Sequence, residues 1–114
     1  QGRPEQLRGL SMGASIKIRA HEIDGQVTVK SVINHPMETG ERKIRKTGRK
    51  IPPHYIREII VSRNRRIVME AFWGKSISRN PYLSFQIAGR KGDAITISWL
   101  DNRGNSDTAT TQVR

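Results

Sequence analysis

The sequence contains no cysteine, so the chain can form no disulfide, hold no thiolate-bound metal ion and offer no cysteine nucleophile. Any thiol that its working chemistry requires must therefore belong to a partner. Aromatic residues make up only 5% of the chain, which leaves too few rings for the stacking platform of a single-strand nucleic-acid binder. No apolar run approaches the ~20 residues that a membrane-spanning helix needs.

The start of the chain also lacks the apolar stretch of a secretory signal peptide. We expect residues 1–12 to be a disordered leader outside the domain, with Met12 as the natural start, and residues 13–114 to form a single domain. A chain of this size can bury about two-thirds of its unfolded surface, which is enough for one core without metal or crosslinks. Export would then depend on a signal carried by another protein.

Negative charge is scarce. The 21 lysines and arginines outnumber 10 aspartates and glutamates, which gives a formal net charge of +11. Such an excess favours nucleic acid, an anionic membrane or an acidic protein as the partner. The cations concentrate in one run, which comprises Arg42, Lys43, Arg45, Lys46, Arg49 and Lys50. This run is open to three interpretations: it binds phosphates, it deters aggregation at a sheet edge, or it steers an acidic protein or a small anion toward the chain.

The pattern that is present is an alternation of apolar and polar residues with a period of two, which is typical of β-strands. It predicts strands over 16–20, 26–34, 55–62, 67–73, 82–87, 94–100 and 106–113, separated by turns rich in Gly, Asn and Asp. About seven short strands without crossover helices predict an all-β, immunoglobulin-like antiparallel β-sandwich. The segment 37–53 should leave a sheet edge, because Pro52 and Pro53 cannot donate ladder hydrogen bonds. Apolar residues on both faces of Ile59-Ile60-Val61 predict a strand covered on both sides.

Nothing in the sequence predicts catalysis. No serine lies on a Gly-x-Ser-x-Gly elbow, and no glycine-rich phosphate loop links a strand to a helix. The three histidines, His21, His35 and His54, raise the hypothesis of a copper or zinc carrier, but their spacing lacks the short pairings of a metal site. We therefore expect no cofactor and no metal.

The large apolar residues suggest a binding surface as well as a core. Phe72 and Trp73 are neighbours and must point to opposite faces of a strand, so one of them can lie outside the core. Together with Met37, Met69 and Tyr82 they have the composition of the centre of a protein interface, although core packing explains most of them.

Four motifs, in this order along the chain, resemble the SoxZ family, the Z subunit of the SoxYZ thiosulfate-oxidation carrier complex. They are His35-Pro36-Met37-Glu38-Thr39-Gly40, Ile51-Pro52, Asn80-Pro81-Tyr82-Leu83-Ser84-Phe85 and Ile97-Ser98-Trp99-Leu100-Asp101. The resemblance covers nearly the whole chain from about Ser15 onward.

The resemblance implies a noncatalytic, immunoglobulin-like subunit that pairs with SoxY as a heterodimer. In that family SoxY bears a cysteine near a Gly-Gly-Cys-Gly-Gly terminus, which carries thiosulfate-derived sulfur between periplasmic Sox enzymes, and the Z subunit is exported with its signal-bearing partner. The resemblance thus also implies transient contacts with other Sox enzymes, and we expect no membrane partner. We take as candidates for the partner interface His35, Pro36, Met37, Glu38, Met69, Phe72, Trp73, Asn80, Pro81 and Tyr82. The alternative function is a small basic β-fold that binds nucleic acid through the run from Arg42 to Lys50.

Overall fold

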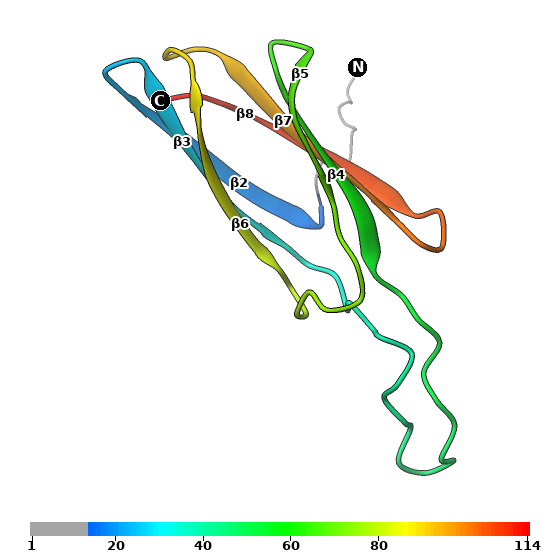
Figure 1. The fold of residues 1–114 in the computed structure, drawn as a ribbon. Coiled ribbons are helices and arrows are strands. Elements are labelled where there is room, and N and C mark those ends of the chain that lie inside the picture. The colour runs from blue at the N-terminus through cyan, green and yellow to red at the C-terminus, as the bar shows by residue number, and fades with distance from the viewer. Residues whose placement is uncertain (1–13) are drawn as a thin grey trace, which may run out of the picture.

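The computed structural model describes residues 14–114, and in this part of the chain all regular structure is β-strand (Figure 1). The expected leader, residues 1–12, lies outside the described residues. The described part contains no helix of the length and hydrophobicity needed to cross a bilayer. The strands are β2 (Ile16–Ile23), β3 (Gln26–Ile33), β4 (Ile56–Arg63), β5 (Arg66–Phe72), β6 (Tyr82–Ala88), β7 (Ala94–Asp101) and β8 (Ser106–Gln112).

These strands form two antiparallel sheets, one of order β2-β3-β6 and one of order β5-β4-β7-β8. The chain changes sheet between β3 and β4, between β5 and β6, and between β6 and β7, which is the Greek-key pattern of immunoglobulin-like sandwiches. The predicted all-β sandwich of seven strands is therefore confirmed.

The core lies between the sheets, where every second residue of each central strand points inward. Val27 and Val29 of β3 face Ile95 and Ile97 of β7, and all four side chains are fully buried. Each such burial stabilises the fold by roughly 1.5–3 kcal/mol relative to an exposed side chain. The period of two in the sequence thus decides which residues build the core.

Strand β4 differs from the sequence prediction on one side. Ile59 and Val61 are fully buried, as a core strand requires, whereas Ile60 is only half-buried on the opposite, outer face. No second layer of the described chain covers that face. The prediction that β4 is covered on both sides is therefore wrong within this domain, because the sandwich has only two layers.

The two sheets are joined along one side and open along the other. Near the C-terminus, Glu22 N donates to Arg114 O at 2.8 Å and Arg114 N donates to Ala20 O at 3.1 Å. These bonds link the end of the chain that follows β8 to β2. Strands β5 and β6 remain as the sheet edges on the opposite side.

Between β3 and β4 the chain leaves the sandwich as a long projecting hairpin (Figure 1), which we call the basic hairpin (residues 38–54). Its two arms meet at isolated bridges between Glu38 and His54 and between Lys43 and Lys50. The predicted excursion over 37–53 is thus observed. At its base, Arg103 donates to the carbonyls of Pro52 and Pro53, each at 3.2 Å, so the turn after β7 holds the hairpin in place.

Candidate functional site

The carboxylate of Asp101, at the end of β7, accepts five hydrogen bonds, and this residue is only 1% exposed. Its Oδ2 accepts hydrogen bonds from His35 Nε2 at 3.1 Å, from His54 Nε2 at 2.7 Å and from Asn105 Nδ2 at 3.2 Å. Its Oδ1 accepts from the backbone N–H groups of Arg103 and Asn105, at 2.9 and 2.8 Å. One buried carboxylate thus connects both ends of the basic hairpin to the last turn of the sandwich.

The two histidines of this cluster lie against each other and against a core aromatic ring. The ring centroids of His35 and His54 are 4.5 Å apart, and the His35 ring meets Trp99 edge-on at 5.2 Å. His35 Nδ1 accepts the backbone N–H of Met37 at 3.1 Å. Because that nitrogen is an acceptor, the proton of the neutral ring lies on Nε2, which donates to Asp101.

This arrangement bears on the metal hypothesis. Possible ligand atoms of His35, His54 and Asp101 lie within 4.8 Å of one another, whereas His21 lies apart, exposed on β2. The lone pair of His35 Nδ1 is already used by Met37 N–H. A metal on Nε2 would require the ring proton to move to Nδ1, where it would oppose that N–H. The donor set therefore fits a hydrogen-bonded structural cluster better than a metal centre.

The cluster shifts the ionisation of two of its members. Burial lowers the pKa of His35, and this effect exceeds the opposing hydrogen bond to Asp101. For Asp101, burial raises the pKa, but the hydrogen bonds from His35, Asn105 and His54 together outweigh it and lower the pKa to about 2. The folded protein thus holds His35 neutral and Asp101 ionised.

We predict that the free energy of unfolding falls in two steps as the pH is lowered. Below about pH 6.5 the unfolded chain binds a proton at His35 that the folded chain resists, and below about pH 4 it binds one at Asp101, so acid favours unfolding in both ranges. The measurement is urea denaturation at a series of pH values from about 7.5 to 3. A stability that does not change between pH 7.5 and 5 would contradict the first step.

The same region brings together two sequence blocks that lie far apart along the chain. The backbone N–H of His35 donates to Asn80 Oδ1 at 3.0 Å, and Asn80 N donates to the His35 carbonyl at 2.9 Å. Ile33 N also donates to the Pro81 carbonyl at 3.0 Å. The His-Pro-Met and Asn-Pro-Tyr blocks, which the sequence singles out separately, therefore form one structural unit at the end of β3 and the start of β6.

The candidate interface residues fall into three groups by exposure. The buried group comprises His35, Met37, Glu38 and Pro81. Two residues lie half-buried against the core, Met69 and Trp73. The exposed group comprises Pro36, Phe72, Asn80 and Tyr82. Buried side chains can influence a partner only by positioning the segments around them. A direct interface role stays a prediction for the exposed group.

All of the predicted steering residues are exposed on the basic hairpin, and they differ in their pairing. Arg42 Nε donates to Glu38 Oε1 at 3.1 Å, and Lys50 Nζ lies 3.6 Å from a carboxylate oxygen of Glu41. Among residues 14–114 no ion pair involves the other four cations, which are Lys43, Arg45, Lys46 and Arg49. The hairpin therefore projects largely uncompensated positive charge.

The outer face of the four-stranded sheet is partly apolar and also carries two carboxylates, Glu58 and Glu70. Alternation along the strands places on it the group that we call the apolar face, which comprises Ile60 and Leu100 of the central strands and Ile67 and Phe72 of the edge strand β5. The register sets Glu58 between Phe72 and Leu100, and it sets Glu70 beside Ile60. Phe72 is 75% exposed and Ile67 is 59% exposed, while Trp73 turns inward against the core. The sequence argument that Phe72 and Trp73 separate is thus confirmed, although only the structure shows which of them is outside.

Hydroxyl groups border the apolar face and satisfy one another. The side-chain oxygens of Thr96 and Thr110 are 2.8 Å apart, and those of Ser98 and Thr108 are 3.0 Å apart, across β7 and β8. Because these hydroxyls already form hydrogen bonds, covering them with a partner costs less than covering groups that are bonded only to water.

A partly apolar sheet face, a projecting cationic hairpin and a buried, hydrogen-bonded polar cluster define a small β-sandwich of the binding type. The model of the family described as "Sulphur oxidation protein SoxZ" matches residues 16–112. The chain therefore belongs to the SoxZ family of noncatalytic Sox subunits, and its role lies in the Sox system of sulfur oxidation. The resemblance inferred from the sequence is confirmed. No curated protein matches the chain.

Proposed function

We propose that this chain is the noncatalytic subunit of a SoxYZ carrier complex, in which it forms a heterodimer with a SoxY-like protein. The cysteine of that partner carries thiosulfate-derived sulfur between periplasmic Sox enzymes, and the two proteins are exported together on the signal of the partner. The absence of cysteine from this chain supports the division of labour, because the reactive sulfur must then lie on the other subunit.

The observation that carries the proposal is the apolar face. A lasting interface has a core of large, desolvated side chains surrounded by polar groups. Phe72 is the most exposed large apolar side chain of the described residues, and Ile60 and Leu100 lie half-buried on the same face. The apolar character of Ile60 has no explanation within the domain, whereas a second sandwich packed on this sheet would bury it.

Size considerations agree with a subunit that is firmly held. A stable heterodimer buries roughly 1,600 Å² in total, or about 800 Å² from each partner. The accessible surface of this chain is 7314 Å², so such an interface would use a modest part of it. A partner that packs on one outer sheet face would bury surface of this kind without any rearrangement of the core.

We predict that this chain and a SoxY-like protein, when expressed together, elute as one complex on size exclusion at micromolar concentration. Since the contact is noncovalent, a partner whose cysteine is replaced by serine should bind equally well. The isolated chain should not turn over thiosulfate. Separate elution of the two proteins, or turnover by this chain alone, would contradict the proposal.

Nucleic-acid binding remains the alternative, and the four unpaired cations of the basic hairpin are the observation in its favour. Contacts from these four to phosphates would make the logarithm of the affinity fall with the logarithm of salt at a slope of about −3 to −4. Titration of duplex and single-stranded oligonucleotides at two salt concentrations measures this slope. Absence of binding at low salt removes the alternative.

A further inference from the structure

The outer face of the three-stranded sheet carries positive charge and no negative charge. Alternation places Lys17 and Arg19 at outward positions of β2 and Lys30 at an outward position of β3, and all three are exposed. No outward position of β2, β3 or β6 holds a carboxylate. This face therefore differs in kind from the apolar face of the other sheet.

Two of these cations oppose each other in the sheet. Arg19 and Lys30 are direct partners in the antiparallel register of β2 and β3, and like charges at opposed positions destabilise a sheet. Neither forms an ion pair with a carboxylate of residues 14–114. The charges of this pair therefore have no partner in the described fold and are available to one outside it.

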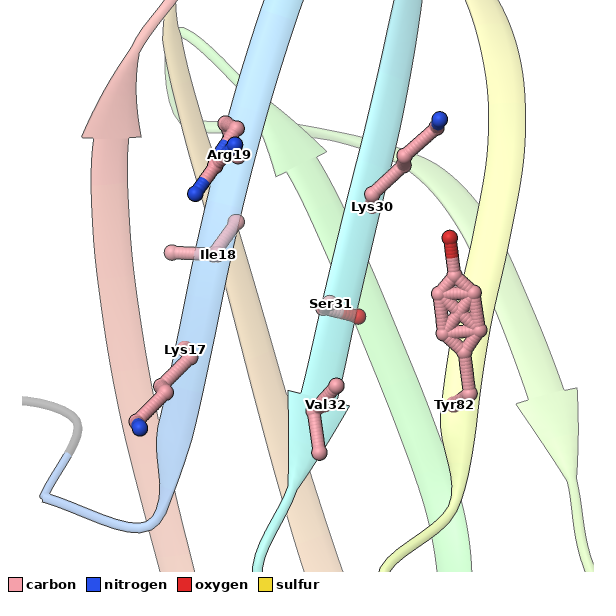
Figure 2. A pocket seen from close by; sticks show the side chains of 7 residues that line it. All are labelled: Lys17, Ile18, Arg19, Lys30, Ser31, Val32 and Tyr82. Carbon is pink, nitrogen blue, oxygen red and sulfur yellow. The ribbon is translucent and has the colours of Figure 1, made fainter.

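An exposed apolar pair lies beside the cations. Val32 is 43% exposed, Tyr82 is 57% exposed, and they are register partners on β3 and β6. Figure 2 shows that these two side chains border the same shallow hollow as the three cations. We call the five residues together the cationic face, which comprises Lys17, Arg19, Lys30, Val32 and Tyr82. A small apolar centre beside uncompensated charge suits a protein contact that forms quickly and is short-lived.

We propose that the cationic face docks acidic surfaces of the enzymes that act on the sulfur-bearing partner. This inference rests on the proposed function, because a carrier must be held firmly by one protein and visited briefly by others. The apolar face serves the lasting contact, and the cationic face serves the transient ones by raising association rates. The like net charge of two copies, a formal +11 on each, opposes a second copy of this chain as the occupant.

A nucleic acid fits the cationic face less well than an acidic protein. Proteins that read single strands stack successive bases on several rings, whereas the outward positions of β2, β3 and β6 hold one Tyr, Tyr82, and no Phe or Trp. Val32 beside it offers aliphatic contact, which a protein side chain can fill and a phosphate backbone cannot use.

The test uses Lys30→Glu in the complex of this chain with its SoxY-like partner. The new glutamate faces Arg19 across the strands, so the substitution forms an opposite-charge pair and should leave the fold as stable or more stable. We expect association with purified Sox enzymes, measured by stopped flow at about 50 mM salt, to slow about tenfold, and this difference to shrink severalfold at about 300 mM salt.

Two control variants change the net charge equally at other places. Lys91→Glu lies in the turn between β6 and β7, and Lys75→Glu lies in the segment between β5 and β6; both positions are exposed. Each control should slow association less than about threefold, since only the long-range field changes.

The proposal would be overturned if all three variants slowed association equally, or if Lys30→Glu did not slow it. Loss of the heterodimer in Lys30→Glu would also overturn it. So would a complex that binds oligonucleotides more tightly than it binds the enzymes, if Lys30→Glu weakened that binding. Failure of the unaltered chain to bind a SoxY-like protein at all would instead refute the proposed function.

Discussion

Asp101→Asn is expected to lower the free energy of unfolding by about 3 kcal/mol, and Tm by roughly 10–20 °C. The carboxylate accepts five hydrogen bonds, two of them from histidine Nε2 atoms and one from Asn105 Nδ2 on the same oxygen. An amide nitrogen at either oxygen position would face buried N–H donors. His35 cannot adapt by exchanging tautomers, because its Nδ1 accepts Met37 N–H.

Urea and thermal denaturation measure this loss. The matched control is Asp24→Asn, which changes an exposed aspartate in the turn between β2 and β3. The φ angle there is 51°, a conformation that asparagine adopts as readily as aspartate does. The control should stay within about 0.5 kcal/mol of the unaltered chain. A loss below about 1 kcal/mol for Asp101→Asn would show that the cluster contributes little to stability.

Phe72→Asp is expected to weaken the heterodimer with the SoxY-like partner by about 100-fold or more. Loss of a large aromatic residue at the centre of an interface costs at least about 2 kcal/mol, which is roughly 30-fold in Kd, and a buried unpaired carboxylate adds to that cost. The isolated chain should lose no more than about 1 kcal/mol of stability, because Phe72 is 75% exposed and the new carboxylate is opposed across the strands only by Glu58. Isothermal calorimetry gives Kd, and urea denaturation checks the fold.

Ile23→Asp is the matched control for this interface. Ile23 is 65% exposed, so it is similar to Phe72 in exposure, but it lies at the end of β2 in the other sheet. It should change Kd by less than about threefold. If both substitutions weakened the complex equally, the apolar face would not be the docking surface and the partner would have to contact both sheets.

Local pattern was sufficient to predict the strands and several turns. The alternation in β7 predicts Ile95, Ile97 and Trp99 on one face, and all three are buried there. At Asp24-Gly25 both residues have positive φ, 51° and 82°, as the predicted tight turn between β2 and β3 requires. Such features depend on residues that are neighbours along the chain, so the sequence displays them directly.

The polar cluster could not be predicted in the same way. His35, His54 and Asp101 lie in three different segments, and 66 positions separate the first from the last. The spacing argument does not foresee that two histidines meet, since their meeting depends on the return of the chain through the basic hairpin, which pairs His54 with Glu38. It also treats His21 as equivalent to the other two, whereas β2 places His21 on an exposed face.

By itself the sequence determined the fold class, the absence of a thiol, the excess of positive charge and the family, because each depends on composition or on short-range order. Only the tertiary structure decided that one buried carboxylate holds both ends of the basic hairpin, that Phe72 rather than Trp73 is exposed, and that the two outer faces differ so strongly in charge. The physical reason is that strand pairing brings together side chains from distant segments, and their burial, charge and hydrogen bonding are properties of that assembly.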